Sequence, residues 1–284
     1  MVKIMADSTC DLSQDLLDKY DISVVPLHIV LGEEEFEDGR AITPDEIYKW
    51  SDANNATPKT SAASLDCVRA EYEKYLKDYD EIVIFSISSQ MSSTIQVMKM
   101  AAEDLEAEER IRVIDSQNLS TGIGLLVIQA AQLAAAGKSA AEIADYVEAK
   151  VPGVRASFVV DTLVYLHRGG RCSGLAAMLG GAMKLHPMIV VENGKMHSSK
   201  KYRGTLGRVI TSYAKDLEPA LLKAEKDRVF ITHSGCDDDI IQQVKSYLES
   251  LNYFDEVLIT RAGGVISSHC GPGTLGVLFV DGEK

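Results

Sequence analysis

Residues 82–94 read IVIFSISSQMSST and predict both a fold class and a place for an anion. The stretch opens with the apolar run Ile82–Phe85, which is typical of a buried strand, and a helical pattern starts at about Ser92. Its hydroxyl side chains are Ser86, Ser88, Ser89, Ser92, Ser93 and Thr94. A helix N-terminus has free N–H groups and a partial positive charge, so hydroxyls beside it make a cradle for an anion. Because the stretch contains no Lys, no His and no metal-ligand spacing, we expect it to hold an anionic group rather than to break bonds.

Strands and helices alternate on both sides of this stretch. We expect further strands at Val2–Ala6, Val24–Leu31 and Ile111–Ile114. We expect helices at residues 64–79, 92–108 and 119–136, and two more that begin with the capping boxes of Thr43 with Glu46 and of Ser139 with Glu142. This order predicts an α/β protein with a mainly parallel sheet. Such sheets bind ligands at the carboxyl ends of their strands, where we expect the loops Asp7-Ser8-Thr9, Ser86–Thr94 and Asp115-Ser116 to meet.

The length of 284 residues favours two domains, and Pro152-Gly153 is a plausible boundary between them. We therefore expect an N-terminal α/β domain over residues 1–153 and a C-terminal α/β domain with a more mixed sheet over residues 154–284. The expected strands of the second domain are Arg155–Val160, Met188–Val191, Val229–Thr232, Val257–Thr260 and Gly276–Val280. The expected helices are Thr205–Ala224 and Asp238–Leu251.

The net charge of −13 argues against nucleic acid as a general partner. The charge is uneven, because residues 167–208 contain eight Lys or Arg and one acid, which makes this segment +7 and the remainder −20. Such a basic segment could steer one acidic partner or anionic ligand, or it could be an ordinary solvated face.

The start of the chain, MVKIMADST, is too short and too polar for a secretory signal, and the longest apolar region is too short to span a bilayer. We therefore expect a cytoplasmic protein without stable membrane insertion. The five cysteines are scattered and form no C-x-x-C motif, which indicates free thiols rather than disulfides or a zinc site.

Three further segments carry candidate binding groups. Thr60-Ser61 is a second hydroxyl cluster close to a predicted helix start at Ser64. Residues 267–273, SSHCGPG, are expected to form a tight turn between two apolar strands, with His269 as a donor that titrates near neutral pH. Arg171 follows two glycines and could pair with a carboxylate or a phosphate. Each segment could equally serve only its local structure.

A serine hydrolase is an alternative, with Ser92, His269 and either Asp7 or Asp115 as its triad. The sequence has no G-x-S-x-G elbow, no dinucleotide fingerprint and no P-loop. We expect no cofactor and no metal ion.

The chain resembles the DegV family over essentially its full length. The motifs that carry the resemblance are, in order, IMADSTCDL, TPKTSAAS, SISSQMSST, VIDSQNLSTGIG, LVYLHRGGRCS, HPMIVVENGKM, KYRG and SSHCGPGTLG. Characterised members of this family are the fatty-acid-binding subunits (FakB) of bacterial fatty acid kinase.

The resemblance implies a two-domain α/β protein with a long-chain fatty acid buried between the domains. It implies that Thr60 and Ser92 hold the carboxylate, with Arg171 and His269 close by and Ser61 and Ser93 in support. Lys201 and Arg203 would belong to the face offered to an ATP-dependent kinase subunit, which makes acyl phosphate for phospholipid synthesis. The chain itself would be a carrier rather than an enzyme, and a lipid sensor without a kinase partner is a further alternative.

Physical chemistry is consistent with such a carrier. Burial of a methylene stabilises by about 0.8 kcal/mol, so a chain of roughly 15 methylenes offers on the order of 12 kcal/mol before ordering costs. Affinity can therefore come from an apolar tunnel, while the polar end orients the carboxylate. Candidate tunnel residues are Met178, Met183, Met188 and the segment Ala176–Leu179, each of which could equally belong to an ordinary core.

Overall fold

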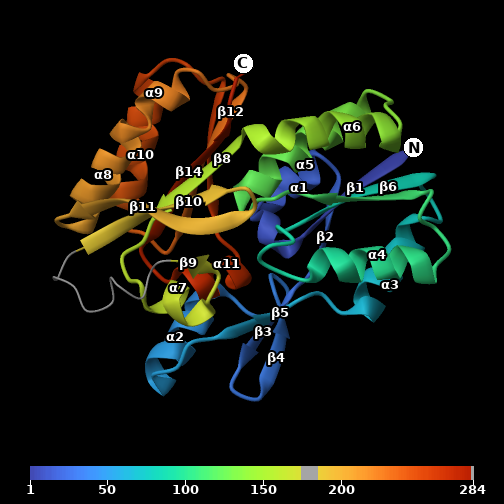
Figure 1. Cartoon of the computed structure of the whole chain (residues 1–284), viewed down its shortest axis with the longest axis horizontal. Coiled ribbons are helices and arrows are strands. Elements are labelled where there is room, and N and C mark those ends of the chain that lie inside the picture. The colour runs from blue at the N-terminus through green and yellow to red at the C-terminus, as the bar shows by residue number, and fades with distance from the viewer. Residues whose placement is uncertain (174–184, 283–284) are drawn as a thin grey trace.

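The computed structural model of the chain describes residues 1–173 and 185–282. The first half contains a parallel sheet with the strand order β2-β1-β6-β7 (Figure 1). Its strands are β1 (Val2–Asp7), β2 (Ile22–Val25), β6 (Glu81–Ser86) and β7 (Ile111–Asp115). β1, β6 and β7 are parallel neighbours, so their carboxyl ends lie at one edge of the sheet. The predicted α/β fold with a parallel sheet is confirmed, and the three hydroxyl-rich loops begin at this edge.

Helices cover both faces of the parallel sheet. α5 (Thr121–Ala135) and α6 (Ala140–Lys150) share one core cluster with Ile4 and Val83 of the sheet. α3 (Leu65–Tyr75) and α4 (Thr94–Asp104) share another with the alternate residues Ile82 and Ile84. The short elements of this half are η1 (Ser8–Cys10), α1 (Gln14–Lys19) and η2 (Val151–Gly153). Side chains alternate across a strand, which is why neighbouring residues of β6 belong to different cores.

A second, smaller sheet interrupts the first half. It has the antiparallel order β4-β3-β5 and is built from β3 (His28–Leu31), β4 (Glu34–Glu37) and β5 (Lys59–Ser61). The prediction of one strand over Val24–Leu31 is therefore wrong, because β2 ends before Pro26 and β3 begins after it. Pro26 has no N–H with which to extend the hydrogen-bonded ladder of β2, and the chain leaves the parallel sheet at this point. α2 (Pro44–Asn54) precedes β5 and starts with the predicted capping box of Thr43 and Glu46.

The second half forms a mixed sheet with the order β13-β12-β14-β8-β10-β11-β9 in the described part of the chain. Its strands are β8 (Val154–Val159), β9 (Cys172–Ser173), β10 (Leu185–Glu192), β11 (Lys195–Arg203), β12 (Arg228–Ser234), β13 (Glu256–Arg261) and β14 (Thr274–Val280). Its helices are α7 (Val164–Gly169), α8 (Leu206–Asp216), α9 (Glu218–Leu221), α10 (Asp238–Ser250) and α11 (Gly264–Cys270). The predicted mixed sheet is confirmed.

Two differences from the sequence prediction affect the binding region. β11 was not predicted, although Asn193-Gly194, both with positive φ, form the turn of the β10–β11 hairpin. The predicted turn at residues 267–273 is wrong over its first four residues, because Ser267–Cys270 belong to α11. A third difference lies away from the cavity: the predicted helix Thr205–Ala224 is split into α8 and α9, with Pro219 in the first turn of α9.

The two halves of the chain share one core. Each sheet lies wholly on one side of Pro152-Gly153, yet the largest core cluster combines Ile4 and Val83 with Phe158 and Ile189. α5 lies between the two halves, and its residues 121–131 are all buried. The division into domains at residues 153 and 154 stays a prediction. No helix in residues 1–173 or 185–282 is long and apolar enough to cross a membrane.

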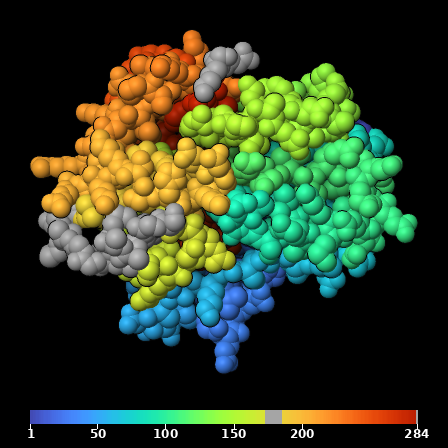
Figure 2. Space-filling model, viewed as in Figure 1, coloured from blue at the N-terminus to red at the C-terminus, as the bar shows by residue number. Residues whose placement is uncertain are grey.

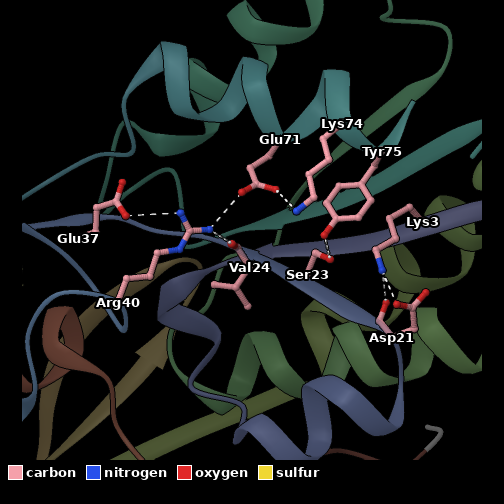
Figure 3. A network of polar contacts seen from close by, with 9 residues as sticks. All are labelled: Lys3, Asp21, Ser23, Val24, Glu37, Arg40, Glu71, Lys74 and Tyr75. Carbon is pink, nitrogen blue, oxygen red and sulfur yellow. Dashed lines mark hydrogen bonds and ion pairs between the residues drawn. The ribbon is translucent and has the colours of Figure 1, made fainter. Parts of the chain in front are cut away.

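A polar network closes the outer edge of the parallel sheet (Figure 3). The buried Lys3 donates to the Asp21 carboxylate at 2.6 Å and to the Asp21 carbonyl oxygen at 2.8 Å. Arg40 donates to Glu71 of α3 at 3.1 Å and to the carbonyl oxygen of Val24 at 3.3 Å. These contacts hold α3 and the β2 edge together.

Candidate functional site

A cavity of about 270 Å³ lies between the carboxyl edge of the parallel sheet, the small sheet and α11. Its polar lining consists of Thr60, Ser61, Ser92, Ser93, Arg171 and His269. Its remaining lining is apolar and consists of Leu27, Ala62, Ile87, Met91, Leu119, Met196, Val265, Ile266 and Cys270. An apolar hollow of about 20 Å³ adjoins it and shares Leu119, Ile266 and Cys270. All six residues that the sequence proposed for head-group recognition therefore line one cavity.

Thr60 and His269 are in direct contact. Thr60 lies in β5, where it pairs with Ile29 of β3, and His269 lies in the last turn of α11. Thr60 Oγ1 is 2.8 Å from His269 Nε2, whereas His269 Nδ1 has no hydrogen-bond partner among the described residues. Burial, aided by the positive charge of Arg171, lowers the pKa of His269 to about 4, so the ring is neutral at pH 7.

This neutral ring carries one hydrogen. When the hydrogen is on Nε2, His269 donates to Thr60 Oγ1, and the hydroxyl hydrogen of Thr60 is then free to point at another acceptor. The pair can therefore offer one hydrogen-bond donor to an anion without adding a full charge to the site.

Ser92 and Ser93 stand at the N-terminus of α4. Ser92 Oγ accepts a hydrogen bond from the Thr94 amide at 3.2 Å and lies 2.9 Å from Thr94 Oγ1. Ser93 is the exposed N-cap residue, and its side chain makes no capping hydrogen bond. Both hydroxyls are therefore near the positive end of the helix dipole, as the sequence predicts for an anion site.

Two of the other hydroxyls of residues 82–94 bond to the backbone instead. Ser86 Oγ donates to the Ile87 carbonyl oxygen at 3.0 Å, and Ser88 Oγ donates to the Gly194 carbonyl oxygen at 2.7 Å. The loop is further held by Asp7, which accepts from the Ile87 amide at 2.7 Å. The predicted cradle is thus smaller than the hydroxyl run, and only its last part reaches the cavity.

Arg171 directly follows α7 and the turn at Gly170. Arg171 is an exposed residue, and its guanidinium group donates to the Gly169 carbonyl oxygen at 2.8 Å and to the Met91 carbonyl oxygen at 3.4 Å. Gly169 also touches the ring of His269, since an added Cβ at Gly169 would lie 2.3 Å from His269 Nδ1. This close approach requires glycine.

The geometry does not assemble a hydrolytic triad. Ser92 contacts Thr94 rather than His269, and the Asp7 carboxylate is bonded to Thr9 and Ile87. Asp115 accepts from the amides of Ser89 and Gln117. No carboxylate in the described part of the chain contacts His269 Nδ1, the place of the group that orients a catalytic base. Within residues 1–173 and 185–282 no cluster of three His, Cys, Asp or Glu side chains could hold a metal ion.

The apolar lining was largely missed by the sequence analysis. Met178, Met183 and Ala176–Leu179 lie outside the described residues. Met188 does not line the cavity, because it packs beside the core of the second half. Met91 and Met196 line it instead, and Met91 was recognisable as an apolar residue inside the hydroxyl-rich loop.

The two residues predicted to face a partner lie outside the cavity. Lys201 and Arg203 are exposed on β11, while the neighbouring Lys200 pairs with Asp216 at 2.5 Å. Figure 2 shows the β10–β11 hairpin at the surface of the molecule.

The fold and the cavity define a class: an α/β protein with two main sheets and a cavity whose lining is apolar apart from six polar side chains. A family model described as the DegV family of uncharacterised proteins matches residues 1–282, and the chain belongs to this family. A DegV domain-containing protein of Caldanaerobacter subterraneus is 31% identical over 280 residues, which cover 98% of each chain.

Two solved structures add ligand information about relatives. The chain is similar to a DegV family protein of Thermus thermophilus described by its fatty acid binding, with 30% identity, a TM-score of 0.90 and 99% of both chains covered. It is also similar to a stearic acid-binding protein of Eubacterium ventriosum, with 26% identity, a TM-score of 0.85 and coverage of 99% of this chain and 98% of that one.

Proposed function

We propose that the chain binds a long-chain fatty acid in this cavity, with the carboxylate at the end formed by Thr60, Ser92, Arg171 and His269. The observation that carries this proposal is a lining that combines apolar side chains with a connected polar group. His269 contacts Thr60 and lies near the charge of Arg171, which donates to the carbonyl oxygen of Met91 beside Ser92. Relatives of the same fold and nearly the same length bind fatty acids, which supports the same ligand class here.

The polar end suits a carboxylate for three physical reasons. The hydroxyls of Thr60 and Ser92 supply neutral donors, and α4 adds the positive end of a helix dipole. Arg171 adds a full positive charge at the exposed edge of the cavity. A buried carboxylate without such partners would be costly, whereas these groups stabilise it without enclosing both of its oxygens in a buried salt bridge.

Mass spectrometry of the native protein tests this proposal directly. Protein purified from bacteria should carry an added mass equal to a fatty acid, and delipidated protein should take up added palmitic acid. The proposal is wrong if the protein is consistently free of ligand and also refuses added palmitic acid.

We further propose that the bound carboxylate is presented to an ATP-dependent kinase subunit, and that Lys201 and Arg203 belong to the docking face. Both side chains are exposed on β11 of the surface hairpin, within the +7 segment of an otherwise acidic chain. Exposed cations on an acidic protein favour approach by a partner of complementary charge. Catalysis would then reside on the partner, and this chain would act as a carrier.

Charge reversal at Arg203 distinguishes a carrier that serves a kinase from a lipid sensor that has no kinase partner. Arg203→Glu should abolish acyl phosphate formation by an added fatty acid kinase while palmitic acid binding stays intact. Lys77→Glu, which reverses the charge of an exposed cation after α3 and outside the +7 segment, is the matched control and should leave both unchanged. Acyl phosphate formation that is unaffected by Arg203→Glu and Lys201→Glu would contradict the docking face.

A further inference from the structure

Two buried carboxylates from the start of the chain hold the N-terminus of α11, the helix that carries His269. Asp11 Oδ1 accepts a hydrogen bond from the Gly263 amide at 2.8 Å, and Asp38 Oδ1 accepts one from the Gly264 amide at 2.7 Å. These contacts join residues 252 and 226 positions apart in the sequence. Asp11 is 5% exposed and Asp38 is 2% exposed.

The remaining oxygens of both carboxylates are held as well. Ser120 Oγ donates to Asp11 Oδ2 at 2.5 Å, and Ser8 Oγ donates to Asp38 Oδ2 at 2.8 Å. No Lys or Arg among the described residues forms an ion pair with either carboxylate. Burial and the nearby carboxylates raise the pKa of Asp11 well above its ordinary value, and burial also raises that of Asp38. Burial of two acids without an ion-pair partner costs stability, which is unusual unless their positions matter for something else.

The close approach depends on glycine at the start of α11. A Cβ added at Gly264 would lie 2.9 Å from Asp38 Oδ1 and 2.4 Å from Ile29 Cδ1. A Cβ added at Gly263 would lie 3.2 Å from Asp11 Oδ1. The carboxylates therefore contact the helix end directly, and the free N–H groups and dipole of that end complement their charge.

α11 is fastened to the small sheet at both ends. At its first residue, Gly264 donates to Asp38, which directly follows β4. In its last turn, His269 contacts Thr60 of β5. The two attachments are about 8 Å apart along the helix axis. A change at Asp38 or Asp11 can therefore shift or tilt α11 and move His269 relative to Thr60.

We propose that Asp11 and Asp38 are positioning residues for carboxylate recognition: they orient α11 so that His269 meets Thr60 at the polar end of the cavity. The proposal rests on the proposed function and deepens it. Neither acid is proposed to contact the ligand, so any effect of Asp11 or Asp38 on binding must act through the orientation of His269.

Head-group discrimination is the readout that separates positioning from a general structural role. It is the ratio of two dissociation constants measured with delipidated protein, that of 1-hexadecanol divided by that of palmitic acid. General damage to the cavity weakens both ligands and leaves the ratio unchanged, whereas a displaced His269 weakens the acid alone. We would measure both constants for Asp11→Ala, Asp38→Ala and the conservative variants Asp11→Asn and Asp38→Asn, together with thermal unfolding.

The ratio should fall about fivefold in the alanine variants, as expected for one misaligned hydrogen bond to a charged group. Because asparagine keeps one acceptor oxygen, the ratio measured for the asparagine variants should lie between those of the wild type and the alanine variants. The asparagine variants also provide the test if an alanine variant does not fold. Ser139→Ala is the matched control, since it removes a helix cap of α6 without touching α11; it should lower stability and preserve the ratio.

The outcomes distinguish the two proposals. If wild type binds neither ligand, or does not prefer the acid, the proposed function itself fails. If wild type prefers the acid and every folded variant keeps the wild-type ratio, the positioning role of Asp11 and Asp38 is overturned. A ratio that also falls in Ser139→Ala would overturn it too, because the effect would then follow stability alone.

Discussion

Thr60 and His269 are 209 positions apart in the sequence, yet Thr60 Oγ1 and His269 Nε2 lie 2.8 Å apart at the polar end of one cavity. The contact joins the small sheet of the first half to α11 of the second. It also brings a neutral hydroxyl and a neutral imidazole to the place where a carboxylate would be bound.

Replacement of Thr60 by valine tests this pair. Thr60→Val keeps the shape of the side chain but removes the donor and leaves His269 Nε2 without its partner. We expect palmitic acid to bind about 10- to 100-fold more weakly, the range for a lost hydrogen bond to a charged group, and 1-hexadecanol to be affected less. Calorimetric titration measures both. Thr211→Val on α8 is the control, and equal losses for acid and alcohol would argue against a role in carboxylate recognition.

Ser92 is predicted to be the serine of its loop that matters most for binding. Ser92→Ala removes a donor at the α4 N-terminus and should weaken palmitic acid binding about tenfold, with a loss of stability of about 1 kcal/mol because its oxygen also accepts from the Thr94 amide. Ser89→Ala, in the same loop but outside the cavity lining, should change neither quantity. Competition with a fluorescent fatty acid reads out affinity, and similar effects of the two substitutions would refute the assignment.

The pKa of His269 should respond to the head group of the ligand. Burial and the charge of Arg171 lower this pKa to about 4, so the ring should be neutral throughout a titration from pH 8 to pH 5. A bound carboxylate stabilises the imidazolium form and should raise the pKa, whereas 1-hexadecanol should not. NMR of the ring resonances follows this titration. Arg171→Gln should also raise the pKa, in contrast to Arg168→Gln, and an identical pKa with acid and alcohol would exclude close contact with the carboxylate.

The contribution of Asp7 to the free energy of unfolding should fall as the pH rises. Burial raises the pKa of Asp7 from 3.8 to about 6, so between these values the folded chain binds more protons than the unfolded chain. The contribution of this carboxyl group to stability therefore falls by on the order of 3 kcal/mol from pH 4 to pH 7. Chemical denaturation of wild type and Asp7→Asn across this range isolates the effect. If the difference in unfolding free energy between wild type and Asp7→Asn did not depend on pH, the pKa of Asp7 would not be raised in the folded chain.

Gly169 is predicted to limit the space around His269. In Gly169→Ala the new Cβ would lie 2.3 Å from His269 Nδ1, so the ring must turn away from Thr60. We expect about tenfold weaker binding of palmitic acid, as for a lost hydrogen bond, with the fold preserved. Gly207→Ala is the control, because its Cβ would meet Ile240 at an ordinary 3.5 Å. Unchanged binding in Gly169→Ala would mean that the ring does not need its observed position.

Local signals in the sequence identified much of the fold. The capping boxes of Thr43 with Glu46 and of Ser139 with Glu142 are both present, because a cap depends only on residues three positions apart. Two further signals were equally local but went unused: Pro26, which separates β2 from β3, and Asn193-Gly194, which turns the β10–β11 hairpin.

The helical state of residues 264–270 was not predictable in the same way. A seven-residue helix that starts with glycine is not stable by itself. Its start is stabilised by Asp11 and Asp38, which are more than 220 positions away in the sequence, and its end by Thr60. Contacts of this range leave no periodic pattern in the segment.

The sequence by itself thus determined the α/β class and the hydroxyl clusters from which an anion site is proposed, since strand patterns, caps and hydroxyl clusters are properties of neighbouring residues. Only the tertiary structure decided which hydroxyls reach the cavity, because Ser88 is drawn to the carbonyl oxygen of Gly194 while Ser92 stays at the cavity wall. It also decided the apolar lining, which combines Met91, Leu119 and Ile266 from three distant segments. A cavity is a property of packing between segments, and no single segment encodes it.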